Sequence, residues 1–223
     1  MKLNKECLKS IAVALIILFL YLGLSGVLTF AFKEAFISKN TFISSTSLTL
    51  GNLFILLIIL LFFVPKLVND SKNLTKDNLK TAYKNWLIGL VIMYVSNFFI
   101  LLINNDLAAN EATNRAILEQ YPIFAILVMV VIAPITEELI FRLSIRNIFK
   151  NKYLYCIFSG LIFGLIHLTS FKEILFVIPY GALGFFFAKT LYDTDNIYAP
   201  IMTHITHNAI IIFILIMGNF IGI

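Results

Sequence analysis

The sequence predicts an all-α fold: a polytopic bundle of about seven transmembrane helices, or eight if one further segment re-enters the membrane. Hydrophobic residues make up 60% of the chain and charged residues only 13%, far from the balance of a water-soluble domain. The apolar residues gather into seven runs, most of them near the ~20 residues that a helix needs to cross a bilayer. These runs and their connections occupy almost all 223 residues, so we expect one membrane domain, residues 1–223.

Three apolar runs precede residue 121. The first, residues 11–32, follows three lysines and is longer than the apolar part of a secretory signal, so we expect a retained anchor. The next two are residues 47–64 and 86–103. With their connections, these three spans form the N-terminal part of the domain, residues 1–120.

Four more runs are expected in residues 121–216. The first, residues 121–149, contains Pro134 and several polar residues, which predicts a broken or kinked helix. Gly181 and Gly184 form a small-residue face in a later run and predict close helix packing. The other three runs are residues 153–168, 174–191 and 197–216.

The basic residues predict how the bundle is oriented in a cell membrane. Five lysines lie in residues 65–85, whereas residues 104–120 carry one arginine and three acidic residues. By the positive-inside rule the N-terminus is cytoplasmic, and seven spans then place the C-terminus outside. Topology explains the net charge of +5 better than a nucleic-acid partner does, so we expect the lipid bilayer as a partner and no nucleic acid.

Ionisable residues inside the apolar runs indicate chemistry within the bilayer. All three histidines, His167, His204 and His207, lie in such runs, and so does the adjacent carboxylate pair of Glu137 and Glu138. Each ionisable group costs on the order of 2.5 to 3.5 kcal/mol at membrane depth on insertion scales. A cluster of such groups in one half of the protein therefore predicts a functional site.

Helical spacing separates the roles of these groups. Glu138 and Arg142 are four residues apart with the acid first, which favours an ion pair between them. Glu137 points about 100° away from Glu138 and has no cation on its own helix, which makes it the freer general base. His204 and Asn208 also lie four residues apart, and the amide of Asn208 can donate to a developing oxyanion.

Three short motifs resemble those of the CAAX protease and bacteriocin-processing family, also called CPBP or Abi. They are EELIFR at residues 137–142, FGLIH at residues 163–167 and HITHN at residues 204–208, in this order. The resemblance covers residues 121–216 and implies a CPBP-like catalytic core. It implies an intramembrane endopeptidase that hydrolyses a peptide bond of a membrane-anchored peptide or protein substrate.

The resemblance also implies a role for each polar residue of the motifs. Glu137 together with His167 would activate a water molecule. His204 and Asn208 would stabilise the tetrahedral oxyanion. The residues that would support this site are Glu138, Arg142 and Phe163.

The cofactor follows less directly, because the family includes enzymes described as metallopeptidases and others described as glutamate-dependent proteases. This chain has no HExxH helix. We therefore favour a glutamate mechanism that requires no cofactor. A divalent metal such as zinc is the open alternative, with Glu137, His167 and His204 as its ligands. His207 is not required by the family pattern, and we expect it to be structural.

Two other functions use the same residues. A noncatalytic bacteriocin-immunity or scaffolding protein of this family would keep its phenotype without the Glu137 carboxylate. A proton-coupled transporter would use the buried Glu and His residues as a relay, although the sequence contains no paired inverted repeats.

Overall fold

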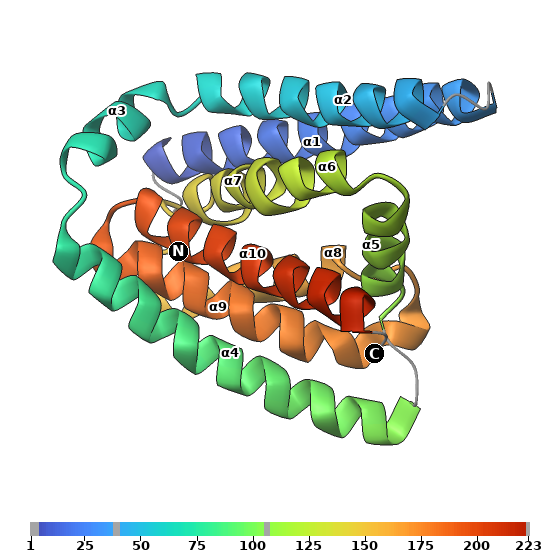
Figure 1. The fold of residues 1–223 in the computed structure, drawn as a ribbon. Coiled ribbons are helices and arrows are strands. Elements are labelled where there is room, and N and C mark those ends of the chain that lie inside the picture. The colour runs from blue at the N-terminus through green and yellow to red at the C-terminus, as the bar shows by residue number, and fades with distance from the viewer. Residues whose placement is uncertain (1–4, 38–40, 105–107, 222–223) are drawn as a thin grey trace.

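A computed structural model describes residues 5–37, 41–104 and 108–221 of the chain. Every element in these ranges is a helix or a helical turn, and the long helices assemble side by side into a bundle (Figure 1). The predicted all-α class is therefore confirmed.

The N-terminal helices lie on two sides of this bundle. Helices α1 (Lys5–Ile37) and α2 (Thr41–Leu61) pack against each other on one side. The short helix α3 (Val64–Lys72) turns away from α2 by 84°. Helix α4 (Lys76–Asn104) then runs along the opposite side of the bundle (Figure 1).

The segment that contains Pro134 is one continuous helical span, Pro122–Leu143. Of the predicted break or kink, the break is therefore wrong and the kink stays a prediction. In the wider π-helical turn before Pro134, backbone bonds reach five residues back, which accommodates a ring that would clash in a regular α-helix. The short helix α5 (Ala109–Gln120) precedes this span. The span consists of α6 (Pro122–Ile126), the π-helical turn η1 (Leu127–Ile132), α7 (Ala133–Glu138) and the π-helical turn η2 (Leu139–Leu143).

The C-terminal helices pack closely because glycines face each other. A Cβ atom on Gly160 would lie 2.6 Å from the carbonyl oxygen of Gly181, and one on Gly184 would lie 3.0 Å from the Cα of Gly160. The close packing predicted from Gly181 and Gly184 is therefore confirmed. The elements here are α8 (Lys152–Ile166), the 3-10 turn η3 (Phe171–Phe176), α9 (Val177–Thr194) and α10 (Tyr198–Ile221).

The number of membrane spans is bounded by helix length and composition. Within the described residues, four helices are long and apolar enough to cross a membrane, or five if the bent pair α2 and α3 counts as one span. Two shorter apolar helices, Leu8–Leu24 and Lys152–Ile166, accompany them. The structure thus supports a multi-pass membrane protein, and the count of seven or eight spans stays a prediction.

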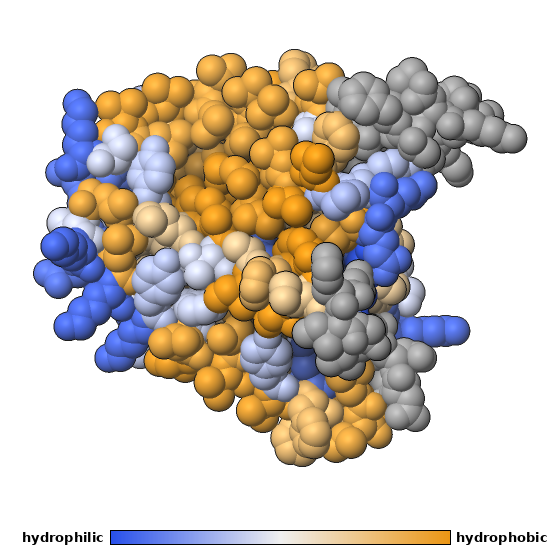
Figure 2. Space-filling model, in the orientation of Figure 1, coloured by the Kyte–Doolittle hydropathy of each residue, from blue (hydrophilic) through white to orange (hydrophobic). Residues whose placement is uncertain are grey.

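The helix ends gather at two opposite ends of the bundle (Figure 1). At one end Lys66 of α3 donates to the Asp195 carbonyl between α9 and α10 (2.7 Å). At the other, Glu173 of η3 accepts the Ala109 backbone N–H at the start of α5 (2.6 Å). Figure 2 shows a broad hydrophobic band between hydrophilic residues at these ends. We call the end at Lys66 the lysine end, because it carries Lys66, Lys72, Lys76, Lys80 and Lys84. We call the opposite end, where Glu173 meets the start of α5, the α5 end.

Candidate active site

Polar residues from three separate segments line one cavity of about 440 Å³. Glu137 comes from α7, His167 from the residue that ends α8, and His204 and Asn208 from α10. The aromatic ring of Phe163 also lines this cavity. The structure therefore brings together residues that lie up to 71 positions apart in the sequence.

The carboxylate of Glu138 lies behind the cavity wall and contacts two cations or potential cations. Its Oε1 lies 2.8 Å from Nδ1 of His204, and its Oε2 lies 3.3 Å from Nε of Arg142. Both Glu138 and Arg142 are fully buried, so the ion pair predicted from their spacing is present. Since the carboxylate beside Arg142 accepts, Nδ1 of His204 carries a proton and the orientation of the imidazole is fixed.

Two aromatic rings stabilise the buried guanidinium of Arg142. Its Cζ lies 4.2 Å from the ring centre of Phe163 and 5.5 Å from that of Phe187. The two terminal nitrogens find no hydrogen-bond partner among the described residues, so these cation–π contacts take the place of hydrogen bonds. Phe187 also stacks on His204, with ring centres 4.6 Å apart. The same rings therefore fix both the arginine and the histidine.

Glu137, unlike its neighbour, faces the cavity. Its side chain is 14% exposed, and its Oε2 lies 3.7 Å from Nε2 of His204. That separation exceeds a hydrogen bond but suits an ion pair when the imidazole is protonated. The rotation of about 100° between consecutive helical residues thus places one carboxylate in the cavity and the other in the packed interior.

His167 is held so that one ring nitrogen remains available. Its Nδ1 lies 2.7 Å from the carbonyl oxygen of Phe163, which can only accept, so Nδ1 donates and Nε2 keeps its lone pair. The imidazole stacks on the ring of Tyr180, with centres 4.7 Å apart. Glu137 lies within electrostatic range of this imidazole. His167 is therefore oriented as an acceptor for a proton from the cavity.

Asn208 is anchored by a carbonyl that the helix itself cannot satisfy. Its Nδ2 donates to the carbonyl oxygen of Met129 at 2.7 Å. In a regular α-helix the N–H of Ala133 would donate to that oxygen, but here it donates to the carbonyl oxygen of Val128. The donor that the π-helical turn would supply is Pro134, which has no N–H. Because of the proline, the Met129 carbonyl has no backbone donor, and one of the two amide hydrogens of Asn208 bonds to it.

His207 and the metal alternative can be judged from the same geometry. His207 also lines the cavity, and its buried ring lies edge-on to Trp86, with ring centres 6.4 Å apart. Among the residues that the structure describes, no three His, Cys, Asp or Glu side chains are grouped so that they could share a metal ion. Glu138 and the Phe163 carbonyl engage Nδ1 of His204 and His167 and leave Nε2 of both rings toward the cavity, so the metal alternative stays a prediction.

Two supporting residues of α8 were missed by sequence reasoning. The hydroxyl of Tyr155 donates to the Arg142 carbonyl at 3.1 Å, and that of Ser159 donates to the Phe141 carbonyl at 2.6 Å. Both acceptors lie in η2, so α8 fixes the backbone that carries Arg142. Their spacing of four residues in an apolar run is a signal that could have identified them, with Phe163 four residues further on.

Comparison with known proteins confirms the resemblance to this family. Residues 119–210 match the family model described as Rce1-like, type II CAAX prenyl endopeptidase. This segment nearly coincides with residues 121–216, where the motifs lie.

Several curated bacterial proteins are similar to the chain. The "Putative membrane peptidase YdiL" of Bacillus subtilis is 29% identical over 158 residues, which are 63% of each chain. UPF0177 protein YxdF of Lactococcus lactis is 26% identical over 69% of this chain and 88% of its own length. An uncharacterized protein of Mycoplasma capricolum is 26% identical over 74% of this chain. The match spans less than two thirds of YdiL and 54% of the Mycoplasma protein. No solved structure matches the chain.

Proposed function

We propose that this chain, whose residues 119–210 match the type II CAAX endopeptidase family, is an intramembrane endopeptidase that uses a glutamate and a histidine to activate water. One observation carries the proposal: Glu137, His167 and His204 come from separate helical segments and line the same cavity. Ionisable groups at membrane depth that converge in this way are characteristic of functional sites.

The first step is the attack of water on the scissile carbonyl. Water held between Glu137 and Nε2 of His167 loses a proton to the Glu137 carboxylate as its oxygen bonds to the carbonyl carbon. Glu137 is suited to this role because it is the one of the two adjacent carboxylates that faces the cavity. The product of this step is a tetrahedral intermediate with a negatively charged oxygen.

The second step is stabilisation and collapse of that intermediate. A protonated His204, held by Glu138, presents its Nε2–H, and Asn208 presents its remaining amide hydrogen. As the carbonyl re-forms, the C–N bond breaks and the proton on Glu137 passes to the departing amine. One water molecule is consumed, and a carboxylic acid and an amine are released.

The test is to replace Glu137 by Gln in the full-length protein in membranes. The amide cannot accept the proton from water, so we expect cleavage of a quenched-fluorescence peptide library to fall at least about a hundredfold, since general-base catalysis contributes about 10²–10⁴. Glu119→Gln is the matched control, because Glu119 is exposed on α5 and lies outside the cavity lining. Full cleavage by the Glu137→Gln protein would reject the mechanism. A protective phenotype that survives this substitution would favour the noncatalytic immunity role.

A further inference from the structure

The cavity extends from the candidate catalytic residues toward only one end of the bundle. On the span Pro122–Leu143 its lining runs from Phe124 to Glu137, and on α10 it runs from His204 to Leu215. Glu137 and His204 are thus the lining residues nearest the lysine end on their helices. All other lining residues of these two helices lie on the α5 side of them.

The lining residues of the remaining helices also show that the cavity extends toward the α5 end. Helix α4 contributes Met93, Tyr94 and Asn97 from its second half, which approaches the α5 end. The farthest wall is α5 itself, through Asn110 and Asn114 among others. Within the described chain, no lining residue belongs to the lysine end, where α3, the start of α4 and the turn between α9 and α10 lie.

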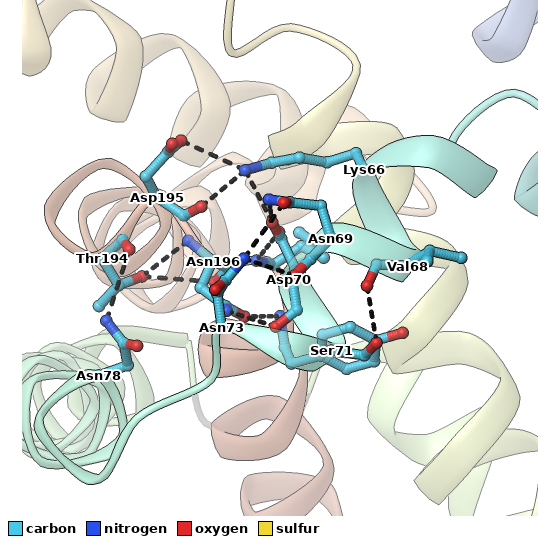
Figure 3. A network of polar contacts seen from close by, with 12 residues as sticks. Lys66, Val68, Asn69, Asp70, Ser71, Asn73, Asn78, Thr194, Asp195 and Asn196 are labelled. Carbon is cyan, nitrogen blue, oxygen red and sulfur yellow. Dashed lines mark hydrogen bonds and ion pairs between the residues drawn. The ribbon is translucent and has the colours of Figure 1, made fainter.

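A hydrogen-bonded network closes the lysine end (Figure 3). Asp70 of α3 is 1% exposed, and its carboxylate accepts the backbone N–H of Ile197 at 2.8 Å. The side chain of Asn196 donates to the Asp70 carbonyl at 2.8 Å. Lys66 bridges the Asp70 carboxylate (3.0 Å) and the Asp195 carbonyl (2.7 Å). Helix α3 is thereby fixed over the start of α10, two turns before His204.

The basic residues assign each end to a side of the membrane. Among the described residues, the lysine end carries the five lysines between residues 65 and 85 together with Arg146, Lys150 and Lys152, which contact Tyr192 or Asp193 near the end of α9. By the positive-inside rule this end faces the cytoplasm, so the α5 end faces outward. Building on the proposed function, we infer that the active-site cavity opens to the extracytoplasmic side and takes its substrate from there.

The lining of the cavity defines the substrate class. Its walls are mainly aromatic and aliphatic, and the polar groups near α5 are neutral amides, those of Asn97, Asn110 and Asn114. Glu111 also lies there, but Arg115 pairs with it at 2.7 Å. This lining fits an extended, uncharged and largely apolar peptide segment at the outer membrane face. The C-terminal tail of a cytoplasmic protein would instead meet the closed lysine end.

The test measures water access to single cysteines and does not depend on catalysis. Ile211 is the main probe, because it lines the cavity wall beyond Asn208. Lys76 probes the lysine end, where it is exposed at the start of α4. Phe213 is the matched control for Ile211, because it lies on the same helix, is 63% exposed and is absent from the cavity lining. Each is changed to Cys in a background where Cys7 and Cys156 are serine.

Intact cells and inside-out vesicles are treated with a charged thiosulfonate that does not cross membranes. We expect Ile211→Cys to be labelled in intact cells and at least tenfold more slowly in inside-out vesicles. Lys76→Cys should show the reverse, and Phe213→Cys should react in neither. Labelling of Ile211→Cys from the cytoplasmic side alone would overturn the inference. Adding Glu137→Gln should leave all rates unchanged, so this assay stands apart from the test of the proposed function.

Discussion

At the level of single residues, two adjacent carboxylates have different surroundings and different expected roles. Glu138 is fully buried and holds both His204 and Arg142, whereas Glu137 reaches the cavity. A buried ion pair adds little net stability, but removing one partner leaves an uncompensated charge in a dry environment. Glu138 should therefore matter for stability through Arg142 and for activity through His204.

These two contributions can be separated by a pair of substitutions. Glu138→Gln leaves the Arg142 guanidinium without a counter-charge and should lower the free energy of unfolding by about 3–5 kcal/mol. Adding Arg142→Met removes the buried charge and should restore most of that stability, as measured by reversible unfolding in detergent. The double variant should still fail to cleave peptide, because His204 has lost its carboxylate partner. An active double variant would reduce Glu138 to a counter-ion of Arg142.

A second pair of substitutions tests why Asn208 is held in place. Asn208→Ala leaves the Met129 carbonyl unpaired and should cost about 1–3 kcal/mol of unfolding free energy. Pro134→Ala supplies the N–H that the π-helical turn lacks, so the double variant should recover much of the loss. If the changes in unfolding free energy of Asn208→Ala and Pro134→Ala simply add in the double variant, the Met129 carbonyl is not the reason that Asn208 is held in place.

At the level of elements, the site depends on irregular helical turns that a close helix contact supports. The π-helical turn η2 presents the carbonyls of Phe141 and Arg142 to hydroxyl groups of α8. The same helix α8 also approaches α9 closely, because Gly160 has no side chain to keep the two helices apart. A change in this contact should therefore move Phe163 and His167, which lie on the same helix.

Gly160→Val tests this dependence. Its Cβ would lie 2.6 Å from the Gly181 carbonyl oxygen and 2.8 Å from the Phe185 nitrogen, so the helices must separate. We expect a loss of about 1–3 kcal/mol in unfolding free energy together with a loss of cleavage. Gly23→Ala is the control, because no atom lies within 4 Å of the added Cβ, and it should be neutral or stabilising. Retained cleavage by Gly160→Val would show that the site tolerates movement of α8.

At the level of the whole molecule, the sequence predicts which polar residues share a site better than it predicts which side chains each of them contacts. Polar residues in lipid must face the protein interior, so Glu137, His167 and His204 could be expected to meet. Their exact partners could not be predicted. The ring of Phe187 lies in an apolar run where aromatic residues are ordinary packing. The effect of Pro134 was predicted only in part, because a proline in a helical pattern usually breaks or kinks the helix, and here the helix continues past it after a π-helical turn.

The contact between Asp70 and Ile197 was equally hidden, because 127 residues separate the two and helical periodicity says nothing about such pairs. It joins the N-terminal helices to the helix that carries His204 and Asn208. This arrangement makes Asp70 a structural link between the two halves of the chain (Figure 3).

Asp70→Ala should weaken that link selectively. The substitution leaves the Ile197 N–H without an acceptor and Lys66 without its buried partner, which should cost about 1–3 kcal/mol of unfolding free energy. Asp70→Asn keeps a side-chain oxygen for the Ile197 N–H and should lose less. Hydrogen exchange measured by mass spectrometry should show faster exchange at the start of α10 in the Ala variant than in the Asn variant. Equal exchange in wild-type and Asp70→Ala proteins would mean that α3 does not hold α10, and that the helix is fixed by its packing against α4, α7, α9 and η1.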